Sequence, residues 1–165
     1  MIAGNNTRRD FTAPWDSRRP DPEKSTWRAK GYVKQEILQQ LAIGVNCLHS
    51  GKLGEPTLMR HYLPDKAYID TNCPDGIRFE LMFPSCWTGG VINTPNHADH
   101  VAYPETVMDG PCPEDFPVRL PGLMFESYYN TVEFKDRSGN FVLSNGDLEG
   151  ECLVICVWLK TVSSA

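Results

Sequence analysis

The chain has 165 residues, a length that fits one domain and suffices to bury a hydrophobic core. Its formal net charge of −5 argues against nucleic acid as a partner, because binding to phosphate backbones needs clustered Lys and Arg. Hydrophobic residues make up 41% of the chain, but no run of about 18 apolar residues occurs, so we expect no membrane span.

The N-terminal segment, residues 1–26, places Pro14, Pro20 and Pro22 among charged and polar residues. A segment of this composition buries little apolar surface, so we expect it to be disordered or non-native and to make few contacts. It also lacks the apolar stretch of a secretory signal peptide.

A short helix and a strand are predicted next. Val33, Ile37 and Leu38 recur at helical spacing, which favours one amphipathic helix over residues 30–40. Residues 42–48 are apolar and partly β-branched, and a turn sequence follows them, so we expect a strand there.

The clearest strand covers residues 77–83. A Cys-Pro-Asp-Gly turn precedes it and Pro84 ends it. Apolar and polar side chains alternate, so we expect a central strand with one buried face, while Arg78 and Glu80 point to solvent or pair across strands. The residues expected to face inward are Ile77, Phe79, Leu81 and Phe83.

A long loop rich in Pro and Gly follows, over residues 85–117. Loops of this length without secondary structure are uncommon in compact domains and are usually functional or pinned. Cys86 and Cys112 lie near its two ends and could pin it. Beyond the loop, residues 118–129 predict one or two strands, and residues 141–143 predict another.

Six cysteines are many for this length, and they are spaced widely, without the C-x-x-C pattern of a metal site. This usage favours disulfides formed in an oxidising compartment. We expect at least one bridge among the first four cysteines, whose three possible pairings stay open. These four are Cys47, Cys73, Cys86 and Cys112. The predicted fold is α+β and mostly β, a single β-sandwich-like domain with long loops pinned by disulfides.

Five short strings, in order, resemble one protein family. They are C-P-D-G-I-R-F-E-L-M-F-P-S-C-W at 73–87, P-N-H-A-D-H-V-A-Y-P at 95–104, P-C-P at 111–113, P-V-R-L-P at 117–121 and S-N-G-D at 144–147. Their order and spacing resemble the large fungal family of secreted proteins known as the domain of unknown function DUF1996. Members of that family are often joined to WSC-type carbohydrate-binding modules.

The resemblance implies an extracellular protein whose partner is a polysaccharide or a cell-wall glycan. It covers roughly residues 41–150, so we divide the chain into the segment 1–26, a partial DUF1996-like domain at 27–150, and a non-family tail at 151–165. We expect residues 150–165 to make few contacts with the core. The family's domain begins earlier and continues differently after Asp147, each time with a further histidine, which implies a truncated and inactive fragment here.

His97 and His100 are the sharpest candidates for chemistry, with Asp99 between them. Two imidazoles and a carboxylate can bind a divalent metal, or the histidines can act as acid and base. The alternative is that both histidines only hydrogen-bond their own loop. Asp147 is the candidate second catalytic group, and we predict that it borders a common cleft with both histidines.

Three further residues are candidate substrate contacts. Trp87 and Tyr103 border the long loop and could stack on a sugar ring, although core packing would also explain them. Arg119 could hold a carboxylate bidentately.

Two functions fit these observations. One is an extracellular enzyme that cleaves polysaccharide, in which acid and base groups share an open cleft. The other is a non-catalytic cell-wall or carbohydrate-binding module with structural histidines. Neither nucleic acid nor a membrane span is predicted, and the sequence does not identify a cofactor.

Overall fold

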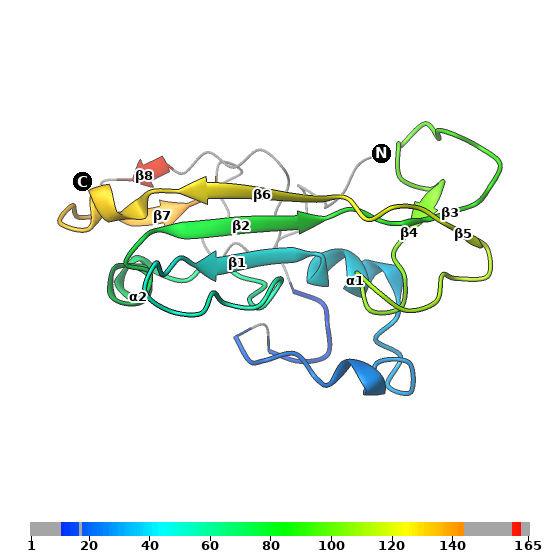
Figure 1. The fold of residues 1–165 in the computed structure, drawn as a ribbon, viewed down its shortest axis with the longest axis horizontal. Helices are drawn as coiled ribbons and strands as arrows, with labels where there is room; N and C mark the ends of the chain where they lie inside the picture. The colour runs from blue at the N-terminus through cyan, green and yellow to red at the C-terminus, as the bar shows by residue number, and fades with distance from the viewer. Residues whose placement is uncertain (1–10, 17, 144–159, 163–165) are drawn as a thin grey trace.

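The main sheet has three antiparallel strands. The structure is a computed structural model that describes residues 11–16, 18–143 and 160–162. In it, β2 (Ile77–Met82) lies between β1 (Ile43–Cys47) and β6 (Met124–Tyr129), as Figure 1 shows. Phe79 of β2 is opposite Val45 on one side and Ser127 on the other.

One face of this sheet forms the first hydrophobic core. The alternating residues of β2 are buried, at 0% exposure for Ile77 and 3% for Phe79. They pack with residues of β1 and with Leu63, Ile69 and Phe141. The prediction of a central strand with these side chains inward is therefore confirmed.

The other face of the sheet is also covered, which the sequence analysis did not predict. Glu80 was expected to point to solvent or to pair across strands; it is 1% exposed and accepts a hydrogen bond from the Asn46 side chain of β1 at 3.1 Å, so the second alternative is the one observed. The reason for its burial is a distant segment: the backbone N–H of Leu58 donates a hydrogen bond to the Glu80 carboxylate, and the Pro56 carbonyl accepts from the Asn46 side chain, so residues 56–58 lie over this face. The alternation of apolar and polar residues along one strand does not show whether a distant segment covers the polar face.

A second core forms around α1 (Gln35–Leu41), which begins later than the expected helix at residues 30–40. Leu38 and Leu41 pack there with Trp27 and Tyr103. In Figure 1, α1 lies at the end of the sheet where β1 begins.

The described part of the N-terminal segment packs against this second core. Ala13 is buried there, and Phe11 and Trp15 lie against it. The Asp21 carboxylate lies 3.0 Å from Nε2 of His61. The expectation of few contacts was therefore wrong for residues 11–16 and 18–26, because the aromatic side chains bury enough surface to outweigh the proline-rich composition. This segment also contains the short helix η1 (Lys24–Thr26).

A helix that the sequence analysis did not predict, α2 (Lys66–Asn72), precedes β2. The Asp65 side chain caps it by accepting a hydrogen bond from the N–H of Tyr68. A disulfide between Cys47 and Cys73 joins the end of β1 to the end of this helix.

Residues 85–117 are not structureless. They contain β3 (Cys86–Trp87) and β4 (Val101–Ala102), which form a small antiparallel sheet with β5 (Val118–Arg119) in the order β4-β3-β5. A second disulfide, Cys86–Cys112, closes the loop. The expectation of a pinned loop is thus confirmed, and the pinning includes strand pairing that two-residue strands do not reveal in a sequence.

The last described elements are η2 (Thr131–Phe134), β7 (Asn140–Val142) and β8 (Lys160–Val162). β8 pairs antiparallel with β7, so this part of the C-terminal segment does contact the domain, contrary to our expectation. The fold is mostly β with two α-helices among the described residues, as predicted. Neither of these helices has the length and apolar character to cross a membrane.

Candidate functional site

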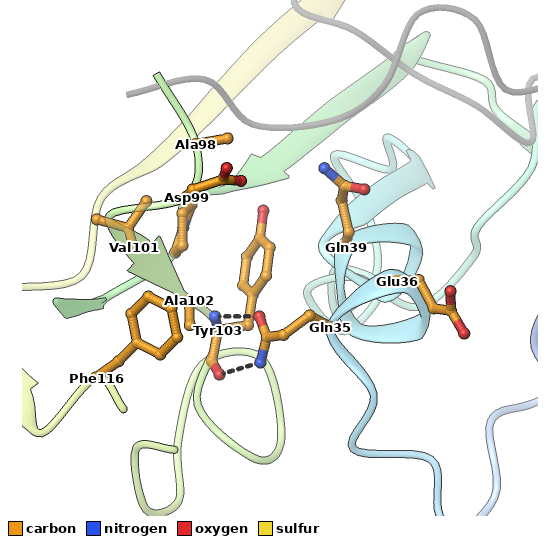
Figure 2. Close-up of a pocket in the computed structure, with 10 residues that line it drawn as sticks. Gln35, Glu36, Gln39, Ala98, Asp99, Val101, Ala102, Tyr103 and Phe116 are labelled. Carbon is orange, nitrogen blue, oxygen red and sulfur yellow. Dashed lines mark hydrogen bonds between the residues drawn. The ribbon is translucent and has the colours of Figure 1, made fainter. Parts of the chain in front are cut away.

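The candidate site is a pocket between α1 and the chain around β4 (Figure 2). Its volume is about 420 Å³, within the range of small-molecule sites. The side chains around it come from four segments, namely α1, the turn between β2 and β3, residues 98–103 and the stretch before β5. They are Gln35, Glu36, Gln39, Pro84, Ala98, Asp99, Val101, Ala102, Tyr103 and Phe116.

Gln35 sets the spacing between the two walls of the pocket. Its side-chain amide donates to the Tyr103 carbonyl at 2.9 Å and accepts from the Tyr103 N–H at 2.7 Å (Figure 2). A neighbouring β-strand would make the same two hydrogen bonds to the backbone N–H and carbonyl of Tyr103. The Gln35 side chain therefore joins α1 to the chain after β4 in the way that a paired strand would.

Tyr103 forms the floor of the pocket. Its side chain is buried, and its hydroxyl donates to the Met82 carbonyl at 2.9 Å. Burial raises the pKa of Tyr103, so the phenol stays neutral at physiological pH. The predicted role in substrate contact is thereby limited to the ring, because the hydroxyl is already engaged.

Polar groups rise above this floor. In Figure 2 the carboxylate of Asp99 and the amide of Gln39 point toward the space between α1 and residues 98–103, while Glu36 points away from it. Asp99 is held by Asn96, whose side-chain oxygen accepts from the N–H groups of Ala98 and Asp99 at 3.1 Å each. The pocket therefore presents a carboxylate and an amide, and its lining contains no Lys or Arg.

A comparison with protein-family models identifies the family of the chain. The model described as domain of unknown function (DUF1996) matches residues 1–154. The chain belongs to the DUF1996 family. The match extends beyond the stretch 41–150 that carries the recognisable strings, and it includes the N-terminal segment that packs on α1. No curated protein and no solved structure matches this chain.

The two predicted histidines of the DUF1996 domain lie beside the pocket wall but do not line the pocket. His97 is exposed, with Nδ1 2.7 Å from Asn93 Oδ1 and a left-handed backbone (φ 56°). His100 is buried, with Nδ1 3.2 Å from Thr94 Oγ1. Both rings thus contact their own loop.

The predicted metal set does not form a cluster within the part of the chain that the structure describes. No group of three His, Cys, Asp or Glu residues is placed there to hold an ion. Of the three proposed ligands, only Asp99 lines the pocket. Asp147, the predicted second catalytic group, lies outside the described residues, so the predicted common cleft stays a prediction.

Trp87 and Arg119 fasten the disulfide-closed loop. The Trp87 indole donates to the Val91 carbonyl at 2.7 Å. Arg119 donates to the carbonyls of Gly110 and Met108 at 2.9 and 2.8 Å, so its contacts in the structure are carbonyls instead of a carboxylate. Neither residue lines the pocket.

Sequence reasoning missed Gln35, Gln39 and Phe116. The two glutamines are four residues apart on α1 and therefore share one face of the helix. Two amides at this spacing on the polar side of an amphipathic helix were a signal that could have been found. Phe116 offered no such signal, because it lies in an irregular stretch before β5.

Proposed function

We propose that this DUF1996 domain is an extracellular carbohydrate-binding domain and that the pocket between α1 and residues 98–103 is its site. The observation that carries the proposal is the lining, in which polar side chains lie beside aromatic ones. Sugar hydroxyls both donate and accept hydrogen bonds, which suits the Asp99 carboxylate and the Gln39 amide. The apolar face of a sugar ring can lie against Tyr103 and Phe116.

Two further facts support this proposal. The bridges Cys47–Cys73 and Cys86–Cys112 are typical of proteins from oxidising compartments, which agrees with an extracellular location. The resemblance to fungal secreted proteins that carry WSC-type carbohydrate-binding modules implies that the domain works near glycans. A neutral or amino sugar suits the site best, because its lining has carboxylates and no cation.

The test is a binding screen on an array of neutral, amino and acidic glycans, followed by calorimetric titration of the best ligand. We expect Asp99→Ala and Gln39→Ala each to weaken binding by about tenfold or more, since each removes a hydrogen-bonding group. Asp109→Ala is the matched control, because this exposed carboxylate lies on the same loop but does not line the pocket. Equal losses in the control, or no glycan bound by folded protein, would overturn the proposal.

A polysaccharide-cleaving enzyme is the second candidate, favoured by two carboxylates on the pocket lining: Asp99 points into the pocket, whereas Glu36 points away from it in this structure and would have to turn inward to take part. Glycoside hydrolysis uses such a pair, one as acid and one as base or nucleophile. The same glycans would be incubated with the protein and assayed for new reducing ends. Product formation that is lost in both Glu36→Gln and Asp99→Asn would establish this reading, and turnover lost in His97→Ala and His100→Ala instead would favour the predicted histidines.

A further inference from the structure

The outer edge of β1 is closed by side chains and backbone of residues 55–61. β1 is an edge strand of the main sheet, and its buried backbone groups need partners from elsewhere in the chain. The Val45 N–H donates to the Arg60 carbonyl at 2.8 Å, and the Val45 carbonyl accepts from the Arg60 guanidinium at 2.8 Å. The Ile43 carbonyl, at the start of the same edge, is contacted by the ring of His61.

His61 lies between two hydrogen-bond acceptors. The residue is 3% exposed, and its Nδ1 is 2.6 Å from the Ile43 carbonyl oxygen, while its Nε2 is 3.0 Å from Oδ2 of Asp21. A carbonyl only accepts, so Nδ1 carries a hydrogen, and an ionised carboxylate only accepts as well. A neutral imidazole has a single ring hydrogen. Two hydrogen bonds at His61 therefore require one proton more than a neutral histidine beside a carboxylate would hold.

The extra proton is placed on the imidazole, because an imidazolium is a weaker acid than a carboxyl group. Each ring nitrogen then donates one hydrogen bond, and the Asp21 carboxylate balances the charge of the buried ring. The other oxygen of that carboxylate, Oδ1, accepts from the Trp15 indole N–H at 3.2 Å. Phe11 is stacked on His61, with ring centroids 6.2 Å apart and 12° between the planes. Both the counter-charge and the stacked ring thus come from the N-terminal segment.

The other charged or titratable side chains near this contact lie on the N-terminal segment and on residues 55–62. Glu55 binds both terminal nitrogens of Arg60 at 3.0 Å each, and the Asp16 carboxylate lies 3.9 Å from Arg19. These four charges balance in pairs, which leaves Asp21 as the carboxylate that His61 faces at hydrogen-bond distance. The full set beside Asp21 is Asp16, Arg18, Arg19, Glu55, Arg60 and Tyr62, with Arg18 5.7 Å from the ring centre of Tyr62.

The contact between His61 and Asp21 joins the N-terminal segment to the main sheet, and that segment also supports α1. The Thr12 N–H donates to the Gln40 side-chain oxygen at 2.9 Å, and the Gln40 amide donates to the Thr12 hydroxyl at 3.0 Å. Trp27 packs in the second core with the apolar face of α1. Loss of the contact at His61 therefore weakens the packing behind the helix that forms one wall of the first pocket.

We propose that the contact between His61 and Asp21 is a pH-sensitive attachment of the N-terminal segment, held while His61 is doubly protonated and weakened when it loses its second proton. In an unfolded chain, histidine titrates close to neutral pH. Because the folded chain holds the proton more tightly, the stabilisation is fully present in mild acid and is lost as the pH rises past neutral. One proton changes the unfolding constant, the ratio of unfolded to folded protein, by up to about tenfold per pH unit. The inference does not rest on the function proposed for the first pocket.

The test is Asp21→Asn in the full chain, with urea unfolding measured from about pH 5 to about pH 9. The Asn oxygen can still accept from the Trp15 indole, which directs the amide N–H groups toward Nε2 of His61. The variant therefore favours a neutral imidazole, whereas the wild type favours an imidazolium. We expect the unfolding constant of the variant, divided by that of the wild type, to fall by up to about tenfold per pH unit as the pH rises.

Asp16→Asn is the matched control. It removes the same charge from the same segment, but the Asp16 carboxylate faces Arg19 and is 53% exposed. The ratio of its unfolding constant to that of the wild type is expected to stay constant over this pH range. A ratio for Asp21→Asn that is constant or rises with pH would overturn the proposal, and so would an equal slope in Asp16→Asn.

A measurement on the wild type decides the question even if Asp21→Asn does not fold. In a nitrogen-15 spectrum at neutral pH, the His61 ring is assigned through its contact with Phe11. We expect both of its nitrogens to carry a hydrogen and the second hydrogen to be lost at alkaline pH. A His61 ring with a single hydrogen at neutral pH would show that the contact holds no extra proton and that the proposal is wrong.

Discussion

Replacement of Glu80 tests whether the cover over the second face of the sheet depends on one buried carboxylate. In Glu80→Ala, the Leu58 N–H loses its acceptor and Arg78 loses a buried partner. A buried donor left without a partner costs about 1–3 kcal/mol, and breaking a buried ion pair costs about 3–5 kcal/mol. Because the Arg78 side chain retains 20% exposure, solvent offsets part of this cost, and we expect a loss of about 3–5 kcal/mol in the free energy of unfolding.

The measurement is urea unfolding followed by circular dichroism, together with the thermal midpoint. For a chain of this size the expected loss corresponds to a midpoint lower by roughly 6–20 °C. Glu126→Ala is the matched control, because Glu126 pairs with the same Arg78 at 3.5 Å but is 35% exposed. An exposed pair contributes about 0–1 kcal/mol. If the two variants lose equal stability, the assignment of Glu80 as the anchor of this face is wrong.

Two further predictions concern the same fold. Burial alone would raise the pKa of Glu55, but the hydrogen bonds from Arg60 and from the backbone N–H of Cys47 outweigh it and hold that pKa below its ordinary value of 4.5. A carboxylate whose pKa is lowered in the folded state stabilises the fold above pH 4.5, and this stabilisation is lost as the pH falls. In urea unfolding at a series of pH values, the difference in free energy of unfolding between wild type and Glu55→Gln should therefore shrink toward acid pH. A difference that grows toward acid pH would contradict the lowered pKa. Loss of the Cys86–Cys112 bridge, which spans 26 residues, should cost about 3–4 kcal/mol, measured by unfolding of the double Ser variant, and an unchanged midpoint would contradict that estimate.

The parts of the fold that could be predicted from the sequence are those set by local pattern. The strand at 77–83 was predictable because its apolar residues alternate and Pro84 stops it. α2 was not, since Ile69 is its one buried residue, and a helix with a single apolar contact shows no periodic stripe. Of three possible disulfide pairings, the observed one follows from the antiparallel pairing of β1 with β2, which brings Cys47 beside the turn at Cys73.

The candidate site was less predictable because long-range contacts create it. Gln35 and Tyr103 are 68 residues apart. The sequence around neither residue predicts that the side-chain amide of Gln35 will bind the backbone of Tyr103. Likewise, His61 gave no signal by itself, and its role depends on Asp21, which lies in a segment whose composition favours disorder. Charged residues that are buried, such as Arg60 and Glu80, depart from the usual burial of apolar side chains, and a sequence pattern does not predict such departures.

The short strands β3 and β4 act as a clasp for the chain between them. Cys86 pairs with Ala102 and Trp87 with Val101, and the disulfide holds β3 from its other side. Doubling the length of a flexible loop costs only about 0.6 kcal/mol once its ends are held. The stretch 88–94 can therefore change in length and sequence over evolution while Asp99 and Tyr103, nearer to β4, keep their places. We expect DUF1996 proteins to diverge in length and sequence at residues 88–94 while the paired strands around them stay unchanged.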